Sequence, residues 1–217
     1  MEKGSKNLSV KVNINNAYLC SNGPQSKNIS FGGQRLFPVS LLKIVDKKTK
    51  FNIPAYFTKL DSEDLALMYD VCDAWEHSKY GEIICKGFIR KAHGYAFARD
   101  FDYFMIETNS AKNKEEAVKS IAQINYNKKL INIDFLQSRS EIERNEKIKG
   151  GATMLVYGIC KYAKQIKSNC IKLYSDNAEN DKMYKKIGFI EVAKSLFILD
   201  RKNFNKVIKN IEKIFLK

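Results

Sequence analysis

KIKGGA (residues 147–152) and NAENDKMYKKIGF (residues 177–189) are the two stretches from which the fold can be assigned. The first lies between a predicted strand and a predicted helix. Its neighbouring glycines, Gly150 and Gly151, let the backbone turn tightly and leave amide N–H groups accessible. The helix that begins there adds the positive end of its dipole, so the turn suits an anion such as a pyrophosphate. Taken alone, the same Gly-Gly pair is also compatible with an ordinary turn, and it lacks the spacing of a P-loop.

The second stretch strengthens the assignment through its distance and order relative to the first. Together the two stretches resemble the GNAT (GCN5-related N-acetyltransferase) superfamily, which has an Arg/Gln-x-x-Gly-x-Gly/Ala turn and a later Asn…Leu-Tyr-x-x-x-Gly-Phe segment. The resemblance is specific from Leu130 to Val192, and the upstream strand order is compatible with it back to Phe37. The motif positions are taken by Lys147, Gly150, Ala152, Asn177, Met183, Tyr184, Gly188 and Phe189.

Three features depart from the pattern of the superfamily. Lys147 replaces Arg or Gln. Lysine keeps a positive charge near the phosphate groups of a ligand bound at this turn, but it loses the planar guanidinium fork of arginine. Asn180 stands where a small residue is usual, and the loop from Ser138 to Lys149 is longer than in most members. None of these changes removes the backbone amide groups that do most of the phosphate binding.

The alternation of apolar residues and turn signals predicts an α/β fold with a mixed central sheet flanked by helices. The resemblance implies a GNAT-like sheet, in which an antiparallel meander splays apart at a parallel strand pair. We expect strands over residues 37–45, 51–60, 102–108, 117–125, 129–137 and 170–174, with one or two more within 188–200. We expect helices from residue 62, over 80–91, from 150, over 177–186 and over 204–216.

Side-chain spacing predicts which faces of two of these elements are buried. In the helix that starts near residue 62, the apolar residues recur at helical steps: Leu65, Met68, Cys72 and Trp75. In the strand over 129–137, Ile131, Ile133 and Phe135 are expected on one face, and Asn132, Asp134 and Leu136 on the other.

The chain is expected to consist of a polar, loosely ordered extension (residues 1–35) and one GNAT-like domain (residues 36–217) that includes an extra C-terminal helix. No apolar run reaches the roughly 18 residues that a membrane span requires, and the N-terminus has no signal-peptide pattern. A cytoplasmic protein is therefore expected. The basic C-terminal helix could lie on a membrane or on RNA, but packing against its own sheet is the favoured interpretation.

The net charge of +14 allows a nucleic-acid partner without favouring one. Only six of the 38 basic residues are arginine, and the lysines are spread along the chain. Five scattered cysteines (Cys20, Cys72, Cys85, Cys160, Cys170) without a Cys-x-x-Cys pair, and two histidines, predict reduced thiols and no metal site. Cys160 and Cys170 have no histidine nearby in the sequence, so structural roles are favoured over a nucleophilic one.

The resemblance implies direct transfer of an acetyl or other acyl group from acetyl-CoA to an amine. Pantetheine would lie between the strands over 129–137 and 170–174, where a backbone N–H polarises the thioester carbonyl. Tyr184 is the expected acid, whereas the base stays open between Asp134, which is preferred, and Glu107. The residues that the resemblance assigns to coenzyme A are Leu136, Gln137, Ser138, Lys147, Ile148, Lys149, Gly150, Gly151, Ala152, Thr153, Asn177 and Tyr184.

The acceptor amine is not readable from the sequence. A small molecule such as a polyamine or an antibiotic, a protein amine and an aminoacyl-tRNA all stay open, as do a monomer and a homodimer. The alternative to an enzyme is a basic, catalytically degenerate module of the same fold that binds RNA or a protein partner. Salt-dependent RNA binding without coenzyme A binding would indicate that alternative.

Overall fold

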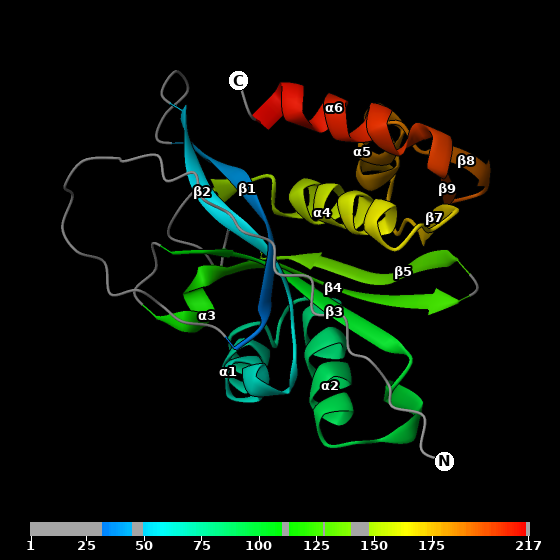
Figure 1. Cartoon of the computed structure of the whole chain (residues 1–217). Helices are drawn as coiled ribbons and strands as arrows, with labels where there is room; N and C mark the ends of the chain where they lie inside the picture. The colour runs from blue at the N-terminus through cyan, green and yellow to red at the C-terminus, as the bar shows by residue number, and fades with distance from the viewer. Residues whose placement is uncertain (1–31, 45–49, 110–112, 128, 140–147, 216–217) are drawn as a thin grey trace, which may run out of the picture.

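The computed structural model describes residues 32–44, 50–109, 113–127, 129–139 and 148–215. These residues form a nine-stranded mixed sheet with helices on both faces (Figure 1). The strands are β1 (Gln34–Ile44), β2 (Lys50–Lys59), β3 (Phe101–Thr108), β4 (Val118–Asn127), β5 (Leu130–Ser138), β6 (Ile148–Lys149), β7 (Cys170–Tyr174), β8 (Ile190–Ala193) and β9 (Leu196–Asp200). The α-helices are α1 (Leu65–Ala74), α2 (Gly81–Ala92), α3 (Lys114–Ala117), α4 (Gly151–Gln165), α5 (Ala178–Ile187) and α6 (Phe204–Phe215).

The strand order is β6-β1-β2-β3-β4-β5-β7-β9-β8. All neighbouring strands are antiparallel except β5 and β7, which run parallel from the pair Leu130–Cys170 to the pair Ile133–Leu173. Beyond Ile133 the residues of β5 have no partner on β7. The predicted mixed sheet is confirmed, including the parallel pair at which its two halves separate.

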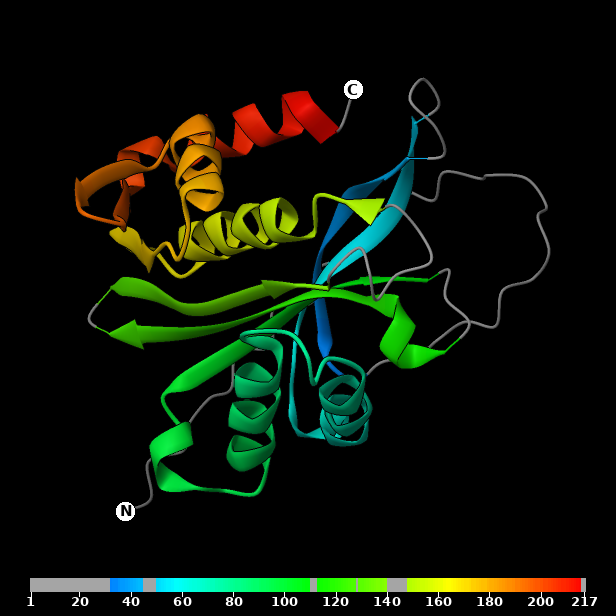
Figure 2. The ribbon, with the colours of Figure 1, turned by 180° about the vertical axis from the view of Figure 1, so that it is seen from behind.

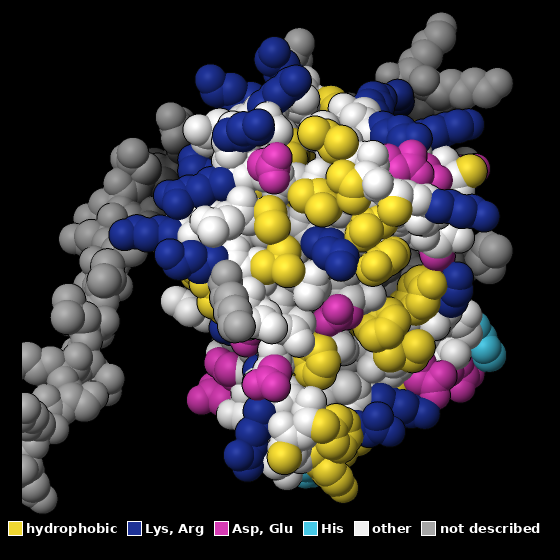
Figure 3. Space-filling model, turned by 90° about the vertical axis from the view of Figure 1, so that its right-hand side faces the viewer, with side chains coloured by type: hydrophobic (Ala, Val, Ile, Leu, Met, Phe, Trp, Pro, Cys, Tyr) yellow, Lys and Arg dark blue, Asp and Glu magenta, His cyan; other side chains and the backbone are white. Residues whose placement is uncertain are grey.

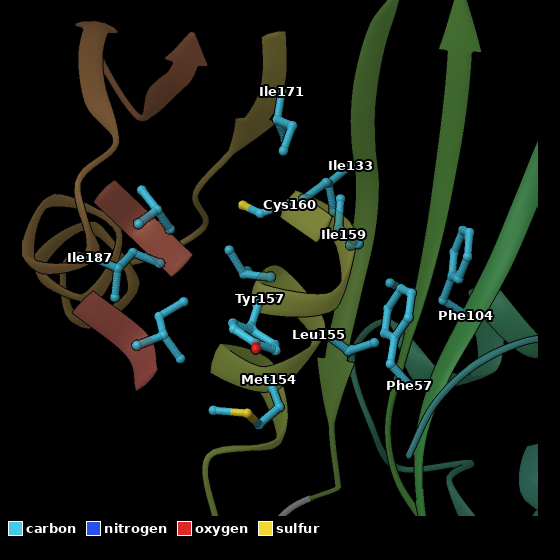
Figure 4. Close-up of a cluster of buried hydrophobic side chains, with 14 of the residues drawn as sticks. Phe57, Phe104, Ile133, Met154, Leu155, Tyr157, Ile159, Cys160, Ile171 and Ile187 are labelled. Atoms are coloured by element: carbon cyan, nitrogen blue, oxygen red, sulfur yellow. The ribbon is translucent and has the colours of Figure 1, made fainter. Parts of the chain in front are cut away.

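Two hydrophobic cores lie on opposite faces of the sheet. Helices α4, α5 and α6 cover one face, and α1 and α2 cover the other (Figures 1 and 2). Figure 4 shows part of the first core, where Phe57 of β2 and Phe104 of β3 stack at 4.9 Å beside α4. Gly158 lets the ring of Phe57 lie close against α4, because a Cβ atom at this position would be 2.1 Å from Cδ2 of Phe57.

A β-bulge interrupts β5 and corrects the predicted alternation along it. Gln123 of β4 pairs with Phe135, and the next residue of β4 pairs with Ile133, so Asp134 has no partner on β4. An extra residue of this kind exchanges the two faces of the strand beyond it. Phe135 therefore packs in the core under α1 and α2, while Leu136 packs in the core under α4. The prediction that Ile131, Ile133 and Phe135 share one face was wrong for Phe135, and the placement of Leu136 on the opposite face was wrong as well.

The predicted start of the first helix is confirmed, but its buried face differs. Asp61 and Asp64 form a capping box around a short 3-10 turn, and α1 continues from it at Leu65. Leu65 and Cys72 are only half-buried. The residues that α1 and its C-cap bury are Leu67, Met68, Val71 and Trp75. Spacing alone admitted both sets, because apolar residues occupy two adjacent rows of this helix.

The two ends of the described chain also differ from expectation in detail. Strand β1 begins at Gln34, two residues before the expected domain boundary, and residues 1–31 lie outside the described part. Within the predicted loop over 138–149, β6 pairs with Leu42 and Lys43 of β1. The C-terminal helix was expected to pack against the sheet, but α6 packs mainly on α4, where Tyr157 Oη donates a hydrogen bond to Glu212 Oε1 at 2.9 Å. Near the end of α6, Phe215 packs against the core, whereas Ile214 is exposed.

Candidate active site

A cavity of about 510 Å³ opens where β5 and β7 separate. Its walls come from the bulged half of β5, the turn between β7 and α5, helix α5, and the connection between α1 and α2. The lining residues are Lys79, Tyr80, Ile133, Asp134, Phe135, Leu136, Gln137, Ser138, Ala152, Tyr174, Ser175, Asp176, Asn177, Asn180, Met183 and Tyr184.

The free edge of β5 forms one wall of this cavity. Leu136, Gln137 and Ser138, all predicted as coenzyme-binding residues, lie on it. Their opposite edge is paired with β4, which holds the backbone in extended form. An extended ligand with amide groups can therefore pair with this edge as an additional strand does.

The turn before α4 adjoins the same cavity and has the geometry expected of an anion site. Gly150 is the N-cap of α4 with φ +98°, a conformation that favours glycine. A Cβ atom on Gly151 would lie 3.1 Å from Ser138 Oγ and 3.2 Å from Ser120 Oγ. Both hydroxyl groups are buried and have no hydrogen-bond partner among the described residues. These two hydroxyl groups lie beneath the turn and require a residue without a side chain at position 151, while the backbone N–H groups at the start of α4 suit an anion.

The other predicted residues of this turn lie in different surroundings. Ala152 lines the cavity, and Thr153 Oγ1 donates to Met183 Sδ at 3.8 Å. Ile148 is buried and Lys149 exposed on β6. Lys147 lies outside the described residues, so its predicted role stays a prediction.

Tyr184 lines the cavity from α5 and is 5% exposed. Its ring contacts Phe189 and Phe197, with centroids 5.8 and 5.6 Å away. Burial, helped by the carboxylates of Asp176 and Asp181, raises the pKa of Tyr184 to about 12. The phenol therefore carries its proton at neutral pH, as a general acid requires.

Asp134 is the bulge residue of β5 and lines the same cavity. Partial burial raises the pKa of its carboxyl group. No described residue forms a hydrogen bond or an ion pair with this carboxylate, which leaves it available to a cationic or proton-donating ligand. The structure thus brings the two predicted catalytic residues, Asp134 and Tyr184, to one cavity.

Glu107, the other candidate base, does not line the cavity. Its buried carboxylate accepts hydrogen bonds from Arg35 Nε at 2.8 Å and from Thr58 Oγ1 at 2.7 Å. Cys160 and Cys170 do not line the cavity either, and burial raises the pKa of both thiols. The contacts of Glu107, and the position of Cys160 and Cys170 away from the cavity, indicate structural roles for all three residues.

Asn177 caps α5, as its position before a helix suggests. Its Oδ1 accepts hydrogen bonds from the backbone N–H groups of Glu179 and Asn180 at 3.0 and 2.9 Å. Its Nδ2 donates to Asp176 Oδ1 at 2.8 Å. The polar atoms of this side chain are thus occupied within the protein, and the predicted contact of Asn177 with coenzyme A stays a prediction.

Sequence reasoning missed the opposite lip of the cavity, which Lys79, Tyr80 and Asp176 form. Lys79 and Asp176 are 97 residues apart in the sequence, and no spacing rule connects them. The unusual Asn180 was the one available signal, because its Nδ2 donates to Asp176 Oδ1 at 2.7 Å.

Lys and Arg side chains surround a band of hydrophobic side chains on the face shown in Figure 3, without merging into one basic patch. Among the described residues, no helix is long and apolar enough to cross a membrane. The same part of the chain contains no group of three or more His, Cys, Asp or Glu residues that could hold a metal ion. Cys72, Cys85, Cys160 and Cys170 are free thiols.

Neither a protein-family model nor the sequence of a curated protein matches this chain. Solved structures do resemble it. RimJ of Mycobacterium smegmatis, solved with CoA-disulfide, is 12% identical over 80% of this chain and 94% of its own, with a TM-score of 0.49. The PaiA N-acetyltransferase of Thermoplasma acidophilum, solved with coenzyme A, is 18% identical over 66% and 96%, with a TM-score of 0.43. A GNAT-family acetyltransferase of Staphylococcus aureus is 6% identical over 68% and 99%, with a TM-score of 0.46.

At these identities and scores the likeness settles neither activity nor acceptor. The topology of the chain itself is more informative. An antiparallel meander, a parallel pair that separates after Ile133, and a glycine turn opening the helix between those two strands make up a GNAT-like fold. The resemblance predicted from the sequence is confirmed at the level of the fold.

Proposed function

We propose that this protein is an N-acyltransferase that moves an acetyl group from acetyl-CoA to a primary amine by direct transfer. One observation carries the proposal. A protonated phenol (Tyr184) and a carboxylate without a partner (Asp134) line one cavity, which opens at the free edge of β5. This arrangement supplies an acid, a base and a strand edge for the thioester in a single space.

Binding of coenzyme A is attributed to two surfaces of the chain. The helix N-terminus at Gly150–Thr153 takes the phosphate groups. The edge of β5 at Leu136 and Gln137 takes the pantetheine arm by backbone pairing.

The chemistry requires three proton transfers. Asp134 removes a proton from the acceptor ammonium group, directly or through a water molecule, so that the neutral amine can attack the thioester carbonyl. A backbone N–H group of β5 stabilises the negative charge that develops on the carbonyl oxygen. The new C–N bond forms, the C–S bond breaks, and Tyr184 gives its proton to the leaving thiolate. The surplus proton on the new amide nitrogen then passes through water to the tyrosinate, which restores the phenol.

The acceptor class is left to experiment among small amines, protein amines and aminoacyl-tRNA. We propose a screen of free-thiol release from acetyl-CoA against a panel of all three, using the full chain. Release that depends on one acceptor, with an acetylated product seen by mass spectrometry, supports the proposal. Failure of acetyl-CoA to bind in a calorimetric titration would rule it out. RNA binding without coenzyme A binding would instead favour the degenerate module.

A further inference from the structure

The connection between α1 and α2 reaches both walls of the cavity. The backbone N–H of Tyr80 donates to Gln137 Oε1 on β5 at 3.3 Å. The next residue toward the N-terminus, Lys79, places its Nζ 3.2 Å from Asp176 Oδ2 in the turn between β7 and α5. A single short segment therefore spans the two strands at the point where they no longer pair with each other.

The Asp176 carboxylate is fixed in place for this contact. Its Oδ1 accepts hydrogen bonds from Asn177 Nδ2 at 2.8 Å and from Asn180 Nδ2 at 2.7 Å, which leaves Oδ2 for Lys79. Partial burial acts to raise the pKa of Asp176, but the hydrogen bonds of Asn180 and Lys79 outweigh it and keep the pKa below its usual value. Hydrogen bonds to Tyr80 and Asp176 raise the pKa of Lys79. Both partners are therefore charged at neutral pH.

This ion pair is poorly suited to a role in folding. The side chains of Lys79 and Asp176 are 63% and 26% exposed, and pairs in such surroundings contribute little to stability and weaken with salt. Their position is more informative than their strength, since both residues, with Asn180, line the cavity at its lip. The departure of Asn180 from the small residue usual in the superfamily is explained by the same contact.

We propose that Lys79 and Asp176 form a specificity-determining bridge across the mouth of the cavity, which admits slim, unbranched amine chains and disfavours wide ones. This inference rests on the proposed function, because it concerns the acceptor side of that site. Asn180 acts as a positioning residue that orients Asp176. Breaking the Lys79–Asp176 ion pair removes the limit on the width of the acceptor chain. It does not alter the turn proposed to bind phosphate, because neither residue belongs to that turn.

The test compares the binding of two coenzyme A thioethers, so that it does not depend on turnover. One carries a linear alkylammonium chain on sulfur, and the other carries an ammonium group of equal charge on a branched or ring-containing chain. Their affinities for the full-length chain, relative to coenzyme A itself, are measured by calorimetry. The variants are Lys79→Met and Asp176→Asn, and the control is Lys86→Met, which breaks the exposed Lys86–Glu82 pair on α2 outside the cavity.

The wild-type protein and Lys86→Met should prefer the slim thioether. Both bridge variants should lose about two- to fivefold of that preference, the range that an exposed ion pair allows. Added salt should reduce the preference of the wild type but not that of Lys79→Met. If all four proteins bind coenzyme A normally and prefer the slim thioether to the same degree, the bridge proposal is wrong while the proposed function stands. Absence of coenzyme A binding to the wild type would overturn the proposed function and the bridge together.

Discussion

Replacing Gly150 by alanine tests whether the turn before α4 holds the phosphate groups. The residue has φ +98°, and a non-glycine residue in the left-handed region costs about 1–2 kcal/mol. The new Cβ would also lie 2.4 Å from Cε1 of Phe215, so the ring near the end of α6 must move. If relief of this strain redirects one amide N–H away from a phosphate oxygen, the lost charge-assisted hydrogen bond is worth about 1.5–3 kcal/mol. That corresponds to roughly a 10- to 150-fold weaker Kd for coenzyme A.

Gly94→Ala is the matched control. Gly94 has φ +81°, and a Cβ there would meet nothing within 4 Å, so the variant isolates the backbone cost. It does not line the cavity. Urea denaturation should show that Gly94→Ala loses about 1–2 kcal/mol of unfolding free energy, and that Gly150→Ala loses more because its Cβ also displaces Phe215. Calorimetry should show weaker coenzyme A binding for Gly150→Ala alone. Unchanged affinity in Gly150→Ala, with the expected loss of stability, would refute the assignment of the phosphate site to this turn.

Three further substitutions separate catalysis from folding. Tyr184→Phe should lower kcat by about 10²–10⁴-fold while the affinity for coenzyme A is kept. The control, Tyr126→Phe on the exposed end of β4, should leave kcat unchanged. Equal kcat values for the two variants would show that Tyr184 is not the acid. Asp134 acts as a base only when ionised, so kcat/KM of the wild type should rise with pH through a pKa above the ordinary aspartate value. If the pH profile of Asp134→Asn shows the same rise, Asp134 is not the base. Gly158→Ala should lower the unfolding free energy by about 1–3 kcal/mol in urea denaturation, because the new methyl group overpacks against Phe57. This cost exceeds the gain in helix propensity, which is about 1 kcal/mol. A variant more stable than the wild type would show that the Phe57 ring can move aside.

The turn and the helix that carry the proposed coenzyme A residues were predictable because their determinants are local in the sequence. The glycine turn opens α4, and the N-cap Asn177 and Tyr184 belong to α5, which follows α4 after the single strand β7. Backbone conformation and helix capping depend on such short-range patterns. The strand β7 was predicted with the bounds that the structure has, since a short apolar run with clear breaks at both ends leaves little freedom.

The acceptor side was not predictable, because it depends on contacts between distant segments. The bulge at Asp134 arises from the register between β4 and β5, and a single strand sequence does not encode register. The pair Lys79–Asp176 likewise exists only because the sheet brings the α1–α2 connection beside the β7–α5 turn. Strand β6 has only two residues, too few for any periodicity to be detected.

A crystal structure of the full-length protein with coenzyme A would test the central claim most directly. We predict that the pantetheine arm pairs with β5 at Leu136 and Gln137, that the phosphate groups contact the backbone at Gly150–Thr153, and that the sulfur lies within hydrogen-bonding distance of Tyr184 Oη. Coenzyme A bound elsewhere on the molecule, or a sulfur atom remote from Tyr184, would contradict the account.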